Sequence, residues 1–123
     1  MRYRIFILLV LFLAIFFNSC YKDNLAMLNP GVKEPCDTSN VTYANKIMDI
    51  MTTKCISCHS SGNAQGGLQL DSYAKVKASA LTGKLYNSVA WNGKANQMPQ
   101  GNSQISDCSI NQIKIWIAKN YSE

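Results

Sequence analysis

Three kinds of side chain are scarce in this sequence of 123 residues. His59 is the only histidine, so the chain offers no pair of imidazoles for a metal ion and no HExxH zinc site. Both arginines, Arg2 and Arg4, lie at the N-terminus, and without them the formal net charge falls from +5 to +3. No arginine is then left to form hydrogen bonds with bases or phosphates. Because the positive charge is also weak, we predict no nucleic-acid partner. Phenylalanine is also missing after Phe17.

The long apolar runs are confined to the first residues. Ile5 to Phe17 are thirteen uninterrupted apolar residues after a short basic start. As a helix they would reach about 20 Å, short of the roughly 30 Å hydrocarbon core of a bilayer. A basic start, an apolar stretch of this length and a small residue at its end are typical of a secretory signal. We therefore predict that residues 1–19 are a signal peptide rather than a membrane-spanning anchor.

The four residues Phe17-Asn18-Ser19-Cys20 resemble the lipobox of bacterial lipoproteins, in which the cysteine becomes the lipidated first residue. This resemblance implies a lipid on Cys20, and the alternative is an ordinary signal cut nearby that leaves Cys20 as a free thiol. Residues 20–35 contain the breaker Asn29-Pro30-Gly31 and no periodic pattern, as in a flexible tether. We expect an exported protein that is lipid-anchored in the bacterial cell envelope, facing the periplasm or at the outer membrane, with one domain over 36–123.

Cys55-Ile56-Ser57-Cys58-His59 is a C-x-x-C-H run, the attachment signature of c-type haem. Two thiols two residues apart reach the two vinyl groups of one porphyrin, and the next residue directs its imidazole at the iron. The sequence predicts one covalent haem c on Cys55 and Cys58, with His59 as an axial ligand. C-x-x-C also occurs in redox dithiols and in zinc sites, for which Cys36 and Cys108 would supply two more thiols.

Because His59 is the only histidine, a second histidine ligand cannot come from this chain. We therefore look for the second axial ligand among the methionines. The candidates are Met27, Met48, Met51 and Met98. Met98 lies in a polar, glycine-bearing loop and is followed by Pro99, which fixes the backbone beside it. Met48 and Met51 belong to an apolar helical pattern and are interpreted as core. We predict His59/Met98 ligation, which raises the potential of a haem.

Cys36 and Cys108 bracket the whole haem segment. In an exported protein unpaired thiols are uncommon, so we expect these two to form a disulfide. The alternative is two reduced, buried thiols. With a lipid on Cys20 and two thioethers, the bridge would account for all five cysteines.

From Val41 to Tyr121 the sequence resembles the small monohaem cytochrome c family in its lipoprotein form. The resemblance rests on the C-I-S-C-H run, the Met98-Pro99 loop and the closing pattern of Ile110, Ile113, Trp116 and Ile117. It implies an all-α fold of three to five helices around a covalent haem, with a C-terminal helix crossing the first. It also implies an electron carrier that is not itself an enzyme and that docks on unidentified redox partner proteins.

Local patterns predict four helices at matching places. Apolar residues recur at helical spacing over 43–52, 71–79, 82–91 and 106–120. Thr38, Ser39 or Asn40 is expected to cap the first helix and Asp71 the second. Gly66-Gly67 would let the backbone approach the porphyrin. No alternating run predicts a sheet.

The sequence departs from better-known members of that family in two ways. No proline occurs over 60–71, so no carbonyl can be named that orients His59. Ile47 and Met51 stand where those members have a glycine and an aromatic residue, and we expect the Met51 sulfur to meet the ring of Trp116.

Three interpretations follow for function. The first is the electron carrier, which six lysines could help to dock on an acidic partner: Lys46, Lys54, Lys75, Lys77, Lys84 and Lys94. The second is a haem subunit of a larger redox enzyme that reacts with a gas or peroxide when Met98 leaves the iron. The third is a haem-free structural lipoprotein that uses its thiols for zinc or disulfides.

Overall fold

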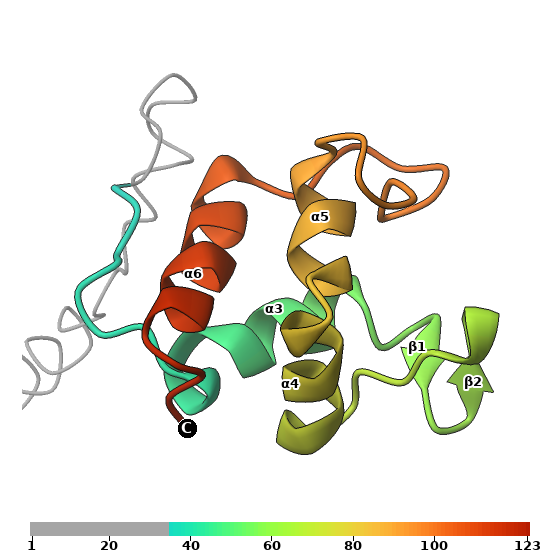
Figure 1. The fold of residues 1–123 in the computed structure, drawn as a ribbon, viewed down its shortest axis with the longest axis horizontal. Coiled ribbons are helices and arrows are strands. Elements are labelled where there is room, and N and C mark those ends of the chain that lie inside the picture. The colour runs from blue at the N-terminus through green and yellow to red at the C-terminus, as the bar shows by residue number, and fades with distance from the viewer. Residues whose placement is uncertain (1–34) are drawn as a thin grey trace, which may run out of the picture. The chain divides into compact units, whose positions relative to one another are not determined.

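The structure, a computed structural model, describes residues 35–123. The predicted signal peptide, Cys20 and the predicted tether up to residue 34 lie outside the described residues. Cys36–Glu123 form one compact unit, which is mostly helical (Figure 1). The coarse fold class predicted from the sequence is therefore confirmed. No helix in this described part of the chain is long and apolar enough to cross a membrane.

The elements follow the order that the apolar patterns predict, with one short hairpin added. In chain order they are η1 (Tyr43–Ile47), α3 (Met48–Lys54), β1 (His59–Ser60), β2 (Asn63–Ala64), η2 (Gln65–Gly67), α4 (Tyr73–Leu81), α5 (Lys84–Ala90) and α6 (Asp107–Ala118). The hairpin pairs β1 with β2 in antiparallel register. Strands of two residues each are too short to show an alternating pattern, so they could not be predicted from the sequence.

The first predicted helix is present as η1 followed directly by α3. Its cap is Thr42 rather than the predicted Thr38, Ser39 or Asn40, because the Thr42 hydroxyl accepts a hydrogen bond from the Asn45 amide at 3.2 Å. Ser39 is engaged elsewhere, since its amide donates to Asp37 in a separate turn. The prediction was therefore right about the helix, which begins at Tyr43, and wrong about the residue that caps it.

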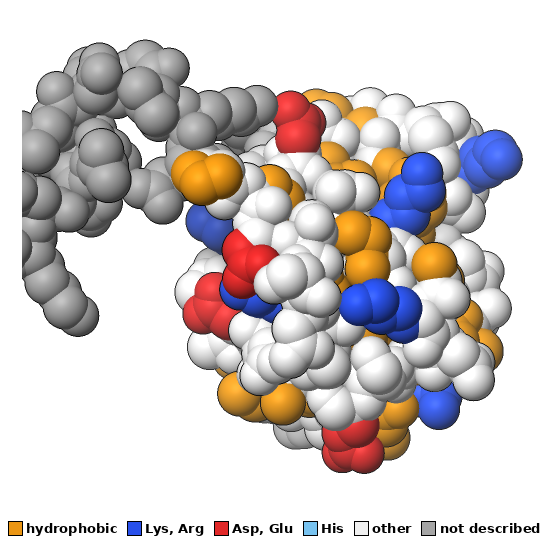
Figure 2. Space-filling view, turned by 90° about the vertical axis from the view of Figure 1, so that its left-hand side faces the viewer, with side chains coloured by type: hydrophobic (Ala, Val, Ile, Leu, Met, Phe, Trp, Pro, Cys, Tyr) orange, Lys and Arg blue, Asp and Glu red, His pale blue; other side chains and the backbone are white. Residues whose placement is uncertain are grey.

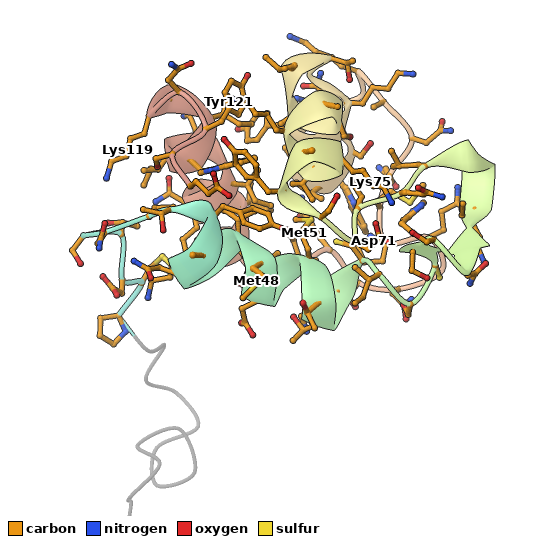
Figure 3. The ribbon with its side chains drawn as sticks, turned by 90° about the horizontal axis from the view of Figure 1, so that it is seen from below. Met48, Met51, Asp71, Lys75, Lys119 and Tyr121 are labelled. Carbon is orange, nitrogen blue, oxygen red and sulfur yellow. A yellow bond between two sulfur atoms is a disulfide. The ribbon has the colours of Figure 1, made fainter. Side chains whose placement is uncertain are left out.

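Met48 and Met51 in this helical segment were both predicted to lie in the hydrophobic core, and only one of them does. Met51 is 1% exposed, whereas Met48 is 50% exposed, and Figure 3 shows the two at different positions around α3. The buried residues here are Tyr43, Ile47, Ile50 and Met51. Their spacing of four, three and one forms a single helical stripe, and Met48 falls outside it.

The second and third predicted helices are present as α4 and α5, which pack against each other. Val76 is buried on α4, and Leu85 and Val89 are buried on α5, as expected. Asp71 does not cap α4; Ser72 holds that position and makes no side-chain cap bond. The Asp71 carboxylate instead accepts hydrogen bonds from Ser61, in the hairpin turn, and from Lys75.

The fourth predicted helix, α6, buries Ile113 and Trp116 and packs against η1 and α5. Trp116 contacts the rings of Tyr43, Tyr73 and Tyr121. Met51 belongs to the same buried core as Trp116, while a direct sulfur–ring contact stays a prediction. The aromatic cluster joins the first helical segment, α4 and α6 without any phenylalanine.

Two further links close the unit at its ends. The Tyr43 amide and the Trp116 indole both donate to the Ser122 carbonyl, each at 2.9 Å. Cys36 and Cys108 form the predicted disulfide, which bridges the start of the unit to the first turn of α6. The chain segments before η1 and after α6 are thereby held to the helices.

Candidate functional site

A cavity of about 530 Å³ brings the predicted haem residues together. Cys55, Cys58 and His59 line it from the turn after α3, and Met98 lines it from the loop after α5. In Figure 1 the hairpin and that loop both lie on the right-hand side of the view. Residues separated by about forty positions in the sequence thus share one space, as the haem prediction requires.

A tight helical turn shapes the C-x-x-C-H segment. α3 ends at Lys54, and the Cys58 and His59 amides both donate to the Cys55 carbonyl, at 3.2 and 3.0 Å. Residues three and four apart in such a turn lie on the same side. The two thiols and the imidazole can therefore face one bound group.

The hairpin fixes the same segment from outside. The Asn63 side-chain amide donates to the Ser57 carbonyl at 2.8 Å, and the Gln65 amide donates to the Cys58 carbonyl at 3.0 Å. The Leu70 amide donates to the His59 carbonyl at 2.7 Å. Because these backbone groups are occupied, the turn has little freedom to rearrange.

The two thiols are not bonded to each other and are partly buried. Burial raises the pKa of the Cys55 thiol to about 11. Reactive cysteines of redox dithiols have lowered pKa values, because the thiolate is the nucleophile. The environment of Cys55 therefore does not favour a redox dithiol.

The Nδ1 atom of His59 is buried and has no hydrogen-bond partner among the residues that the structure describes. A buried polar nitrogen without a partner is costly, and such atoms are rare in folded proteins. This matches the departure noted in the sequence, where no proline carbonyl follows the histidine.

Met98 has its backbone held at both ends. Its amide donates to the Ser88 carbonyl at 3.1 Å, and its carbonyl accepts from the Trp91 indole at 2.8 Å. Met48 is exposed and Met51 lies in the core, and neither lines the cavity. Met27 lies outside the described residues. Among the three candidate methionines that the structure describes, Met98 is the one that lines the cavity.

The rest of the cavity suits a large, mostly apolar group. Its apolar lining residues are Leu68, Leu70, Leu85, Val89, Pro99 and Ile105. Lys54 and Lys84 are the charged residues among those that line it, and both are exposed. Cofactor cavities of 300–1,000 Å³ are typically lined in this way, with a few polar groups that fix orientation. By volume, lining and donor set, the residues present fit a haem.

Gly66 also lines the cavity. Gly66 and Gly67 both have positive φ, and a Cβ at either would meet no atom within 4 Å. The conformation of the turn, rather than crowding by the protein itself, accounts for these glycines. The predicted close approach to a porphyrin stays a prediction.

The zinc alternative loses two of its thiols, because Cys36 and Cys108 are bonded to each other. Over residues 35–123 the structure contains no cluster of three or more His, Cys, Asp and Glu side chains that could hold a metal ion. A site of four cysteines, as the sequence allowed, is therefore not formed.

Three of the six lysines named above have partners within the chain. Lys46 is paired with Asp37, Lys75 with Asp71, and Lys77 lies over the rings of Tyr73 and Tyr121. On the side of the molecule that carries α6, acidic and basic side chains are interspersed (Figure 2). The rim of the cavity thus retains Lys54 and Lys84 from the original set.

Two contributors to the site were missed in the sequence. Ser88 and Trp91 hold the backbone of Met98, yet no local pattern marks a carbonyl acceptor or an indole donor that acts across a loop.

No protein-family model, no curated protein and no solved structure matches this chain.

Proposed function

We propose that this protein is a monohaem c-type cytochrome that carries single electrons while attached by a lipid to the bacterial cell envelope. One observation carries the proposal: Cys55, Cys58, His59 and Met98 line the same cavity. Of these, three come from a five-residue run and the fourth from a loop on another part of the fold. Their chemistry matches covalent attachment and two axial ligands.

Each residue has a defined role in this proposal. The thiols of Cys55 and Cys58 would hold a haem covalently, as thioethers at its two vinyl groups. His59 would bind its iron through an imidazole nitrogen and Met98 through a thioether sulfur. The haem supplies reversible one-electron chemistry at iron.

The chain's other residues support transfer rather than catalysis. The apolar lining keeps water from the cavity, and the turn after α3 holds Cys58 and His59 in fixed relation to Cys55. With His59 and Met98 both bound to iron, no position at the iron would be open for a substrate. Lys54 and Lys84 at the rim would favour a partner protein with an acidic docking surface.

Haem attachment can be measured directly. We would produce the protein together with a c-type haem-attachment machinery and record a pyridine haemochrome spectrum after acid–acetone extraction. We expect one covalent haem per chain, and none in a C55A/C58A double variant. Ser57→Ala, in the same turn but without a ligand role, is the matched control and should keep full attachment. A wild-type protein that matures without covalent haem would refute the proposal.

Binding of carbon monoxide to the reduced protein distinguishes the gas- or peroxide-reactive subunit from the electron carrier. If His59 and Met98 both stay on ferrous iron, the reduced spectrum should not change under carbon monoxide. A prompt shift at neutral pH in the wild type would favour the reactive subunit over the carrier.

A further inference from the structure

The loop that carries Met98 borders two open spaces. Besides the cavity that holds Met98, a second hollow of about 430 Å³ lies against this loop and is lined by Trp91. Four loop residues line both spaces: Asn96, Pro99, Gln100 and Asn102. Close packing, which fixes most side chains in a fold, therefore contributes little where the loop lines these two spaces.

Two hydrogen bonds replace that packing at Met98. They run from the Met98 amide to the Ser88 carbonyl and from the Trp91 indole to the Met98 carbonyl. Ser88 belongs to α5 and Trp91 follows its last residue. The backbone of Met98 is thus attached through both of its polar groups to one helix end.

Trp91 occupies an uncommon backbone conformation for so large a residue. It is the C-cap of α5 with φ +51°, in the left-handed region. Glycine or asparagine adopts this conformation at lower cost and is the usual residue at such a position. An unfavourable conformation that is kept at a functional site is a reason to look for a role of the side chain. Here the side chain is what reaches the Met98 carbonyl.

We propose that Trp91 is a positioning residue that holds the Met98 thioether in place as the sixth ligand. The inference rests on the proposed function and adds a residue that no motif indicates. The indole acts through the Met98 backbone and does not itself bind the iron. Without its N–H group, the bond to the Ser88 carbonyl alone would hold Met98 and the loop would sample positions away from the cavity.

The test compares Trp91→Phe with Trp116→Phe in the haem-loaded full chain. Each variant loses one indole N–H bond to a backbone carbonyl, to Met98 in the first case and to Ser122 in the second. For W91F we expect haem still attached, loss of the absorption band of the iron–methionine bond, a lowered potential and binding of carbon monoxide to ferrous iron. W116F should keep the methionine band and exclude carbon monoxide.

Hydrogen exchange gives a readout that does not depend on electron transfer. In W91F, amide exchange over residues 92–104 should be about fivefold faster, as expected for one lost hydrogen bond of ordinary strength. Exchange in α6 should be unchanged. If W91F does not fold, benzothienylalanine at position 91, which keeps the ring shape and lacks the N–H group, takes its place.

The outcomes separate the two proposals. A colourless wild type refutes the proposed function, and the role of Trp91 with it. A wild type with histidine–methionine ligation that is unaltered in W91F, together with unchanged exchange over 92–104, refutes the role of Trp91 alone.

Discussion

Among the residues proposed to hold a haem, the chain fixes Cys58 and His59 more firmly than Met98. Hydrogen bonds within the turn and from the Gln65 and Leu70 amides hold the first two, whereas Met98 lies on a loop that borders two open spaces. Attachment and axial ligation are therefore separable at the scale of single residues. A defect in the loop should open the iron without releasing the porphyrin.

The variant Met98→Ala tests directly whether haem attachment and axial ligation are separable. We expect the variant to keep its covalent haem, to bind carbon monoxide stoichiometrically when reduced, and to have a lower reduction potential, because a thioether favours ferrous iron. Optical titration and potentiometry measure both effects. Met48→Ala, at a methionine that is half exposed on α3, is the control and should behave as the wild type. An M98A spectrum identical to the wild type would rule out Met98 as the ligand.

A second prediction concerns Asp71. Hydrogen bonds from Lys75 and from Ser61, in the hairpin turn, lower the pKa of its carboxyl well below the ordinary value. A folded-state pKa below the unfolded value adds stability that is fully present above the unfolded pKa, near 4, and is lost as the pH falls further. D71N should therefore be less stable than the wild type at pH 7, and the difference should shrink below about pH 4.

Thermal unfolding followed by circular dichroism at several pH values measures this difference. Asp49→Asn, on the surface of α3, is the control for removing one exposed carboxylate. A D71N deficit of constant size from pH 7 to pH 2.5 would show that the charge of Asp71 is not what the hairpin contact uses.

At the scale of elements, the covalent link between the start of the unit and α6 stands out. The disulfide joins residues 72 positions apart. In the chain-entropy model a loop of that length contributes about 4 kcal/mol. We expect C36S/C108S to lower the free energy of unfolding by roughly that amount in urea.

Reductant supplies the control for the disulfide prediction. It should destabilise the wild type to a similar extent and leave C36S/C108S unchanged. If the double variant unfolds at the same urea concentration as the wild type, the bridge does not stabilise this fold.

The helices could be predicted from sequence because each carries a periodic apolar stripe, such as Ile113 and Trp116 on α6. The residues that cap the first two helices were harder to predict. Residues 38–42 contain several residues able to cap, and only the path of the chain decides that Thr42 does so. Met48 was assigned to the core because it is apolar, whereas its place beside the buried stripe depends on how η1 joins α3.

The candidate site was predictable only where its chemistry lies in adjacent residues. The C-x-x-C-H run names three cavity residues by itself, and Met98 was found because Pro99 follows it in a loop. Trp91 was not found, since its hydrogen bond to Met98 depends on a left-handed backbone and on the course of the loop. Asp71 was assigned to a helix cap because no local signal shows that Ser61 lies beside it.

At the scale of the whole molecule, a lipid on Cys20, as predicted from the sequence, would determine where the protein works. Several acyl chains make membrane attachment stable. We expect Cys20→Ala to move the protein from the membrane fraction to the soluble fraction while the haem, if attached, stays in place. Fractionation with labelled palmitate measures this. A C20A protein that stays with membranes would contradict the anchor, and Lys22→Ala is a control that should remain bound.

The Cys36–Cys108 bridge has a mechanical consequence for such an anchored protein. Under the proposed anchoring, tension along the chain from the membrane would reach the unit at Cys36. There the disulfide to Cys108 provides a second covalent path, which leads directly into α6. Part of the load then bypasses η1 and α3, the elements that lead into the C-x-x-C-H turn. The bridge would thus act as a strain relief, so that pulling on the anchor does not disturb the geometry at the iron.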